Sequence, residues 1–237
     1  MLLYCTKTAF RYRGRMIPRI LIDSTQVPGG GEMRLFSRGA DFFISLGREE
    51  LMTSRMSGSE EALATMTADR VRAEAPHFLI GGYGMGFTLR AALGRLGPGA
   101  RVTVAELVPA VVAWARGPMA AMTGASLDDP RVGVIAEDVG AVIAAGRGAY
   151  DAILLDVDNG PDGLTRPGND RLYSARGLEA ARGALRTGGV LAVWSAAPDA
   201  KFARRMSEAG FRVDEVAVRA RSNGKGAKHV IWFGVRG

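Results

Sequence analysis

The chain has 237 residues, of which 47% are hydrophobic, and it carries a formal net charge of +7. This length and apolar content suffice for one large globular domain with a small appendage. The chain has one cysteine, which excludes an internal disulfide, and its two histidines lie far apart, so we expect neither a zinc cluster nor another structural metal.

The distribution of charge and apolar residues predicts a soluble cytoplasmic protein without membrane association. Positive charges near the start follow the few apolar residues, whereas in a secretory signal they precede them. The longest apolar stretch, VTVAELVPAVVAWA, is too short to cross a bilayer and contains Glu106. The arginines are scattered and follow no nucleic-acid-binding pattern, which favours a solvated basic surface over contacts with nucleic acid.

The first quarter of the chain contains short β-like runs. IPRILIDS, EMRLFSR and DFFISLG are separated by the turns VPGGGE and SRGAD, so we interpret residues 1–56 as a small β-hairpin region. SGSEEALATMTADRVRAEA follows, with Ser57 and Glu60 spaced as a capping box. A helix should begin there and lead into the main domain, residues 57–237.

From His77 onward, β-type runs alternate with helix-type runs. The strand candidates are HFLIGG, RVTVAEL, RVGVIAED, YDAILLDVD and GGVLAVWSAA. Apolar strands separated by helices indicate a parallel sheet that is buried on both faces. FRVDEVAVRARS and KHVIWFGVRG are joined by a short turn without a helix, so they should pair antiparallel. We therefore predict a doubly wound α/β fold with a mostly parallel seven-stranded sheet.

Four glycines fall within the six residues Gly81–Gly86, between the first strand and the first helix of this domain. A P-loop would need a lysine and a hydroxyl residue after Gly86, but Phe87 and Thr88 follow. A dinucleotide fingerprint would need its third glycine at the position of Phe87. The spacing of Gly82, Gly84 and Gly86 resembles that of class I methyltransferases, which bind S-adenosylmethionine, although a plain glycine turn remains an alternative.

Acidic residues end the next three strands of the predicted sheet. Glu106 can accept hydrogen bonds from both ribose hydroxyls, and Asp138 can reach an adenine amino group. Asp156 ends the fourth strand. Each acid could instead cap a helix or face solvent. Because ligands bind at the carboxyl ends of such strands, their joint placement predicts an adenosyl-binding site.

Several segments together resemble the spermidine synthases (polyamine aminopropyltransferases) of the class I S-adenosylmethionine-dependent methyltransferase superfamily. They are LIGGYGMGFTLRAAL, VTVAEL, RVGVIAED, YDAILLDVDNGPDGL and GGVLAVW, within about residues 77–196. ELMTSRMSGSEEAL is similar to the segment that covers the active site in that family. The resemblance implies a Rossmann-like fold, no metal and a possible homodimer.

The chain departs from the family pattern at three positions. Met85 stands where the family has an aspartate that holds the amino end of decarboxylated S-adenosylmethionine, so ordinary S-adenosylmethionine becomes the easier fit. Asp156 matches the first acid of the Asp-x-x-Asp motif, but Asn159 replaces the second. Ser59 takes the place of a tyrosine in the covering segment.

Asp156 is the residue that we predict to take a proton from the attacking amine. The segment DVDNGPDGLTRPGND is acidic within a basic chain, which suits a cationic substrate, although it could equally be a surface loop. Core packing is the alternative role for Trp194. The donor site is predicted to comprise Gly82, Gly84, Met85, Gly86, Glu106 and Asp138, and the acceptor site Asp158, Asn159, Tyr173, Trp194 and Ser195.

The leading hypothesis is a transferase that uses S-adenosylmethionine to methylate a small, amine-bearing acceptor. The first alternative is aminopropyl transfer from decarboxylated S-adenosylmethionine. A non-catalytic protein that binds an adenosyl ligand and an enzyme that modifies nucleic acid are further alternatives.

Overall fold

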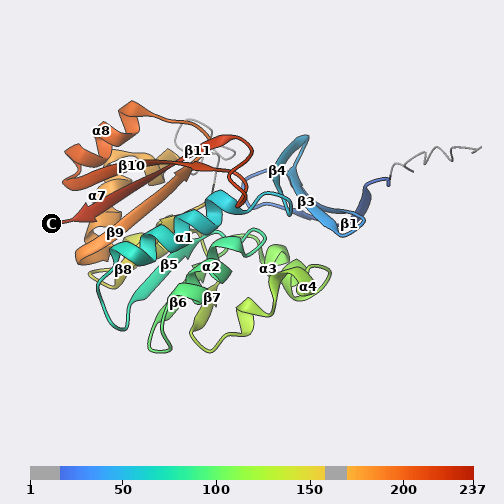
Figure 1. Ribbon diagram of the computed structural model, residues 1–237, viewed down its shortest axis with the longest axis horizontal. Coiled ribbons are helices and arrows are strands. Elements are labelled where there is room, and N and C mark those ends of the chain that lie inside the picture. Colours follow the sequence, from blue (N-terminus) through green and yellow to red (C-terminus); the bar gives the residue numbers. More distant parts are fainter. Residues whose placement is uncertain (1–16, 158–169) are drawn as a thin grey trace, which may run out of the picture.

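The computed structural model describes residues 17–157 and 170–237, which form two sheets and the helices around them (Figure 1). Of the predicted site residues, Asp158 and Asn159 lie outside the described part. A small antiparallel sheet lies at the N-terminal side, and a larger sheet forms the main domain (Figure 1).

The small sheet is a meander of four strands, in the order β1-β2-β3-β4. The strands are β1 (Ile20–Gln26), β2 (Glu32–Arg38), β3 (Asp41–Leu46) and β4 (Glu49–Thr53). Leu35 and Ile44 are buried in the same hydrophobic cluster as residues of the main domain. The predicted hairpins therefore join into one sheet, and the apolar side of this sheet packs into the hydrophobic core of the main domain.

The main sheet has seven strands, in the order β10-β11-β9-β8-β5-β6-β7. Strands β5 to β9 are parallel to one another, and β11 pairs antiparallel with both β9 and β10. This confirms the predicted doubly wound, mostly parallel sheet. The strands are β5 (His77–Gly81), β6 (Arg101–Ala105), β7 (Val132–Ile135), β8 (Tyr150–Leu155), β9 (Leu185–Ser195), β10 (Phe211–Arg219) and β11 (Lys228–Arg236).

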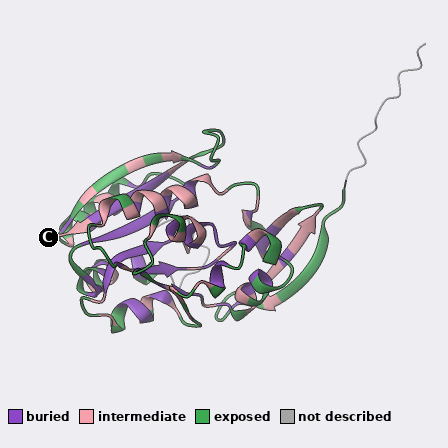
Figure 2. Ribbon diagram, turned by 60° about the horizontal axis from the view of Figure 1, so that its bottom comes forward, coloured by how far each residue is buried: buried purple, intermediate pink, exposed green. Residues whose placement is uncertain are grey.

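Two hydrophobic clusters flank the main sheet, one on each face. The helices are α1 (Gly58–Arg70), α2 (Phe87–Arg95), α3 (Pro109–Arg116), α4 (Ala120–Thr123), α5 (Val139–Ala145), α6 (Asp170–Tyr173), α7 (Ala175–Ala184) and α8 (Ala200–Glu208), with a 3-10 turn at Ser126–Asp128. The central strands are buried between these helices, whereas β1 is largely exposed (Figure 2). Within the described residues, no helix is long and apolar enough to span a membrane.

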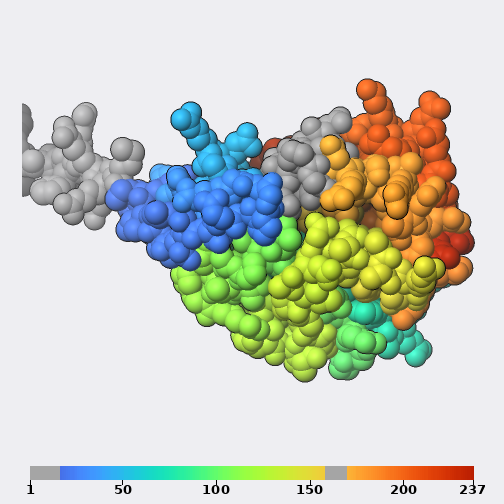
Figure 3. Space-filling model, turned by 180° about the vertical axis from the view of Figure 1, so that it is seen from behind, coloured from blue at the N-terminus to red at the C-terminus, as the bar shows by residue number. Residues whose placement is uncertain are grey.

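The small sheet packs against the segment around α3 (Figure 3). Trp114 on α3 is buried and donates a hydrogen bond from Nε1 to Asp23 Oδ2 on β1, at 2.7 Å. Val27, after β1, belongs to the same cluster as Val108 and Val111. The small sheet is thereby held beside the carboxyl end of β6, where the sequence predicts the ligand site.

The start of α1 differs from the prediction. The helix begins at Gly58, but the side chain of Ser57 makes no capping hydrogen bond, so the predicted capping box is wrong. A tertiary contact holds this end instead, because Gly58 N donates to Ala220 O at 3.0 Å. A Cβ at Gly58 would lie 2.3 Å from the carbonyl carbon of Arg221, so only glycine allows this approach. The Glu60 side chain is consequently available for another role.

Candidate functional site

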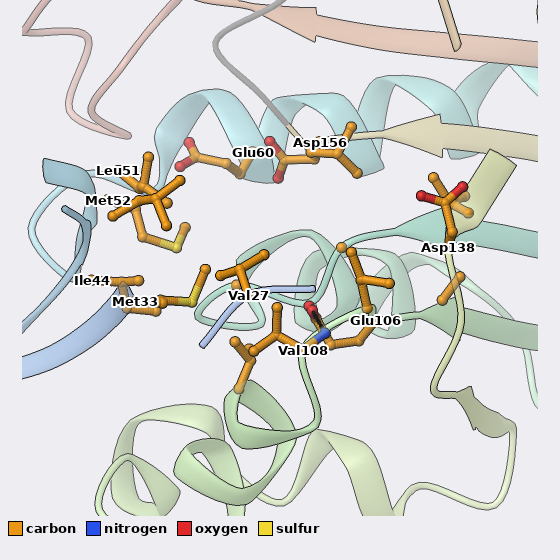
Figure 4. A pocket seen from close by; sticks show the side chains of 18 of the residues that line it. Val27, Met33, Ile44, Leu51, Met52, Glu60, Glu106, Val108, Asp138 and Asp156 are labelled. Carbon is orange, nitrogen blue, oxygen red and sulfur yellow. Dashed lines mark hydrogen bonds between the residues drawn. The ribbon is translucent and has the colours of Figure 1, made fainter. Parts of the chain in front are cut away.

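A pocket opens where the strand order of the main sheet reverses. Strand β5 pairs with β6 on one side and with β8 on the other. Helix α2, which follows β5, packs in one of the two hydrophobic clusters, and α7, between β8 and β9, packs in the other. Such a switch point creates a crevice at the carboxyl ends of the strands, which is where ligands bind in open α/β sheets. The pocket is lined by residues that follow β5, β6, β7 and β8, and by residues of the small sheet (Figure 4).

The glycine loop forms one wall of this pocket. Gly82, Gly84 and Gly86 all have positive φ angles, of 81°, 54° and 74°, which side chains rarely adopt. A Cβ at Gly82 would lie 3.0 Å from Asp156 O, so the turn passes close to the end of β8. Gly82 and Gly84 line the pocket, whereas Gly86 is the residue before α2 and turns the chain into that helix.

The structure places Met85 away from the pocket. Its side chain is fully buried in the hydrophobic core, and it is not among the residues that line the cavity. The Met85 side chain therefore does not line the pocket in which we predict the donor to bind. The side chains of a tight turn follow no periodicity, so the sequence did not reveal which of them point inward.

Glu106 is held rigidly at the carboxyl end of β6. Its Oε2 accepts a hydrogen bond from Tyr83 N, and its Oε1 accepts one from Val108 N, both at 2.8 Å. Burial raises the pKa of this carboxyl, and backbone N–H groups, foremost those of Tyr83 and Val108, oppose the rise. The N–H groups of Gly84 and Leu107 act on the same carboxyl, so ribose hydroxyls would share its oxygens with backbone donors.

Asp138 lies on the pocket wall and also caps a helix. Its Oδ1 accepts hydrogen bonds from Gly140 N at 2.9 Å and Ala141 N at 3.3 Å, at the start of α5. Since both capping bonds use Oδ1, the carboxylate retains acceptor capacity toward the pocket. The two roles weighed from the sequence, a helix cap and a ligand contact, are compatible here.

Asp156, which follows β8, faces a second acid across the pocket wall. Burial raises the pKa of Asp156 to about 6, although Thr88 Oγ1 donates a hydrogen bond to its Oδ2 at 2.9 Å. Glu60 on α1 is 9% exposed and lines the same pocket (Figure 4). Burial, followed by the charge of Asp156, raises the pKa of Glu60 to about 7. Two carboxyls that are hard to ionise together therefore meet at this point.

Sequence reasoning missed Glu60 and the apolar wall opposite it. Glu60 was interpreted only as part of a capping box, although its position in the segment similar to the family's covering segment could have indicated a place in the site. The small sheet and the loops at its edges supply Val27, Met33, Ile44, Leu51 and Met52 to the wall (Figure 4). Leu46 of β3 also lines the pocket. No local pattern marks these residues as ligand contacts, because the packing of two sheets brings them to the pocket.

The predicted acceptor residues are only partly brought together. Trp194 lines the pocket, and its buried Nε1 has no hydrogen-bond partner among the described residues. Tyr173 is buried and packs edge-on against Phe202, with ring centroids 5.7 Å apart. The hydroxyl of Ser195 donates to Ala197 O at 2.7 Å. Neither Tyr173 nor Ser195 lines the pocket, because both side chains serve local packing and a turn.

The charged groups of the pocket are all acidic. Four carboxyls line it, those of Glu60, Glu106, Asp138 and Asp156, and the described lining residues include no lysine, arginine or histidine. Within the described ranges, no group of three or more His, Cys, Asp or Glu side chains is arranged to hold a metal ion. The pocket therefore favours a cationic ligand.

The architecture is that of the spermidine synthases, a class I methyltransferase-like α/β fold with a small N-terminal sheet. The spermidine synthase of Thermotoga maritima aligns with a TM-score of 0.73 and 19% identity over 92% of this chain and 72% of that chain. A spermidine synthase in complex with the transition state analogue AdoDATO aligns with a TM-score of 0.72 and 19% identity, with the same shares covered. A probable spermidine synthase from Corynebacterium glutamicum aligns with a TM-score of 0.63 and 17% identity over 91% of this chain and 79% of that one.

The sequence itself is similar to a curated protein. Polyamine aminopropyltransferase 1 of Streptomyces coelicolor is 30% identical in an alignment of 187 residues, which covers 76% of this chain and 31% of that protein. The chain thus spans about a third of the length of this relative. No family model matches the chain. These similarities confirm the resemblance to spermidine synthases that the sequence motifs predict.

Proposed function

We propose that this protein is an aminopropyltransferase, which transfers the aminopropyl group of decarboxylated S-adenosylmethionine to a small amine. The observation that carries the proposal is the charge of the pocket, with four acids and no base among its described lining residues. The similarity to Polyamine aminopropyltransferase 1 supports the same reaction type.

The charge of the pocket distinguishes the two donors. Ordinary S-adenosylmethionine carries a carboxylate, which would need a basic side chain or free backbone N–H groups beside these acids. The decarboxylated donor carries an ammonium and a sulfonium, and both are attracted by carboxylates. The preference for the ordinary donor rested on Met85, which lies in the core and not at the pocket. The comparisons likewise favour aminopropyl transfer over the methylation that we expected first.

The reaction is an in-line displacement, so the protein must position the reactants and expose the amine lone pair. In the proposed site, Glu106 holds the ribose, and Asp156 takes a proton from the ammonium of the acceptor. The amine nitrogen then attacks the carbon bonded to the sulfonium, the C–S bond breaks, and sulfur leaves as a neutral thioether. The product amine is again cationic, and one proton per turnover must leave the site.

The test compares both donors with the purified protein. Calorimetry should show tighter binding of the decarboxylated donor, and mass spectrometry should show an aminopropylated product with putrescine or spermidine as the probe amine. Tighter binding of ordinary S-adenosylmethionine, together with a methylated product, would instead restore the methyltransferase hypothesis. Donor binding without any amine-dependent product would indicate a non-catalytic protein.

A matched pair of variants tests the role of Asp156. Asp156→Asn retains the size and the hydrogen bond from Thr88 but cannot take a proton, so turnover should fall by about 10²-fold or more while donor affinity stays close to that of the wild type. Glu179→Gln, an exposed acid on α7, is the control and should leave turnover unchanged. Near-normal turnover of Asp156→Asn would remove this residue as the proton acceptor.

A further inference from the structure

A chain of polar side chains leads from the pocket to the half-buried His229. Glu60 Oε2 accepts a hydrogen bond from Ser59 Oγ at 2.7 Å, and Ser59 Oγ lies 2.9 Å from His229 Nδ1. At the inner end, Glu60 and Asp156 line the same pocket wall (Figure 4). Glu60, Ser59 and His229 thus form one series of hydrogen-bond contacts between α1 and β11, and Asp156 lines the pocket at its inner end.

The fold holds this series in place. The close approach of Gly58 to the backbone after β10 positions the first turn of α1 beside the hairpin of β10 and β11. Ser59, in that turn, therefore meets His229 on β11. Strand β11 pairs with β9, and the rings of His229 and Trp194 pack edge to face, with centroids 4.8 Å apart. The imidazole is thereby fixed between the pocket wall and the hairpin.

The hydrogen bonds assign a direction to the series. When Glu60 is ionised its oxygens only accept, so Ser59 must donate to Glu60 and accept from the protonated Nδ1 of His229. When Glu60 is protonated, the hydroxyl can reverse, accept from Glu60 and donate to an unprotonated Nδ1. A proton can then pass from the carboxyl to the unprotonated Nδ1. The series is reset when the hydroxyl reverses and the imidazole, by exchange with water, loses its Nδ1 proton and gains one on Nε2.

We propose that Glu60, Ser59 and His229 carry the proton that the acceptor amine releases out of the buried site. This inference rests on the proposed aminopropyl transfer, which produces one proton per turnover inside the pocket. Asp156 receives the proton as the ammonium N–H bond breaks, and a water molecule in the pocket relays the proton from Asp156 to Glu60. The Glu60 proton then bonds to Ser59 Oγ as the hydroxyl proton of Ser59 bonds to Nδ1. The imidazolium releases its Nε2 proton to water, and no oxidant or second reactant is required.

The charged groups around the series are consistent with proton release. Besides Asp156, Glu61 on α1 raises the pKa of Glu60, whereas the hydrogen bond from Ser59 lowers it. Thr88 on α2 is the hydrogen-bond partner of Asp156. Burial lowers the pKa of His229, and its ring contacts Trp194 and Ser59. An imidazolium of low pKa gives up its proton readily near neutral pH.

The first test measures the coupling of the two ends without any substrate. The chain contains two histidines, so the ring signals of His229 can be followed by NMR with His77 as an internal reference. In the wild type the ring signals of His229 should show a second transition near pH 7, as Glu60 ionises and the Ser59 hydroxyl reverses, and Glu60→Gln should abolish this transition. Glu61→Gln, at the adjacent residue, should change it much less. An unchanged His229 titration in Glu60→Gln would overturn the inference.

The second test measures turnover with decarboxylated S-adenosylmethionine and putrescine. Ser59→Ala and His229→Gln should each lower kcat by about 10-fold, with the amine KM and donor affinity unchanged, and the double variant should lose no more than the worse single variant. Ser207→Ala, on α8, removes an exposed hydroxyl as the control. A wild-type kcat and pH profile in both single variants would overturn the inference. Failure of the proposed function would be distinct, because the wild type would then form no aminopropylated product while His229 still responded to Glu60→Gln.

Discussion

Replacement of Glu60 by glutamine should change the stability of the protein in a pH-dependent manner. The pKa of this carboxyl rises from its ordinary 4.5 to about 7 on folding, mainly through burial and then through Asp156. An acid whose pKa is raised in the folded state holds its proton more tightly there. The stability associated with Glu60 is therefore complete below about pH 4.5 and is lost as the pH rises toward 7.

The size of this effect follows from the pKa change. Since one pKa unit corresponds to about 1.4 kcal/mol, the rise in the pKa of Glu60 corresponds to at most about 3 kcal/mol of stability. Part of this free energy reflects the coupled ionisation of Asp156. The glutamine side chain introduced by Glu60→Gln stays neutral at every pH, and its amide oxygen can still accept from Ser59. At each pH, the free energy of unfolding of the wild type is subtracted from that of Glu60→Gln. This difference should be about 1 to 3 kcal/mol larger at pH 8 than at pH 5.

Urea unfolding at pH 5 and pH 8, without ligand, measures this difference. Glu179→Gln is the control, because an exposed glutamate on α7 should give the same small change at both pH values. Addition of a diamine should reduce the advantage of Glu60→Gln at pH 8, since a bound cation offsets the repulsion between the two acids. If Glu60→Gln differed from the wild type equally at pH 5 and pH 8, the two carboxyls would not oppose each other's ionisation.

Three further predictions concern the pocket walls. In Glu106→Gln, the new amide N–H would face one of the two backbone N–H groups that Glu106 accepts from. Calorimetry should show that the sulfonium substrate binds about 5- to 150-fold more weakly. Unchanged affinity would contradict the proposed hydrogen bonds between Glu106 and the ribose. Gly82→Ala should impair turnover more than Gly84→Ala, because its Cβ would press on the rigid backbone oxygen of Asp156, whereas that of Gly84 meets a flexible methionine; equal steady-state losses would refute this ranking. Trp194→Phe should raise the amine or donor KM by several-fold, and an unchanged KM for both would show that its unpaired Nε1 meets no ligand.

Much of the fold and the donor side of the pocket could be predicted from local sequence patterns. Apolar runs without alternation indicate strands buried on both faces, and their separation by helices requires parallel pairing. Parallel strands end at the same edge, so the residues after consecutive strands must converge. For this reason Gly82, Glu106, Asp138 and Asp156 were all identified, and all four line the pocket.

Other parts of the site depend on contacts between distant segments. Ser57 and Glu60 have the spacing of a capping box, yet the approach of Gly58 to the β10–β11 hairpin leaves Glu60 facing Asp156. Met85 sits between two glycines of the loop but turns into the core.

The amino-acid sequence alone therefore determined the succession of strands and helices, the glycine turn and the acids at the strand ends, because each of these follows from residues close together in the chain. Only the tertiary structure decided that the small N-terminal sheet closes the pocket and that Glu60, Ser59 and His229 meet. Such contacts arise from the packing of elements more than a hundred residues apart, and no local pattern records them.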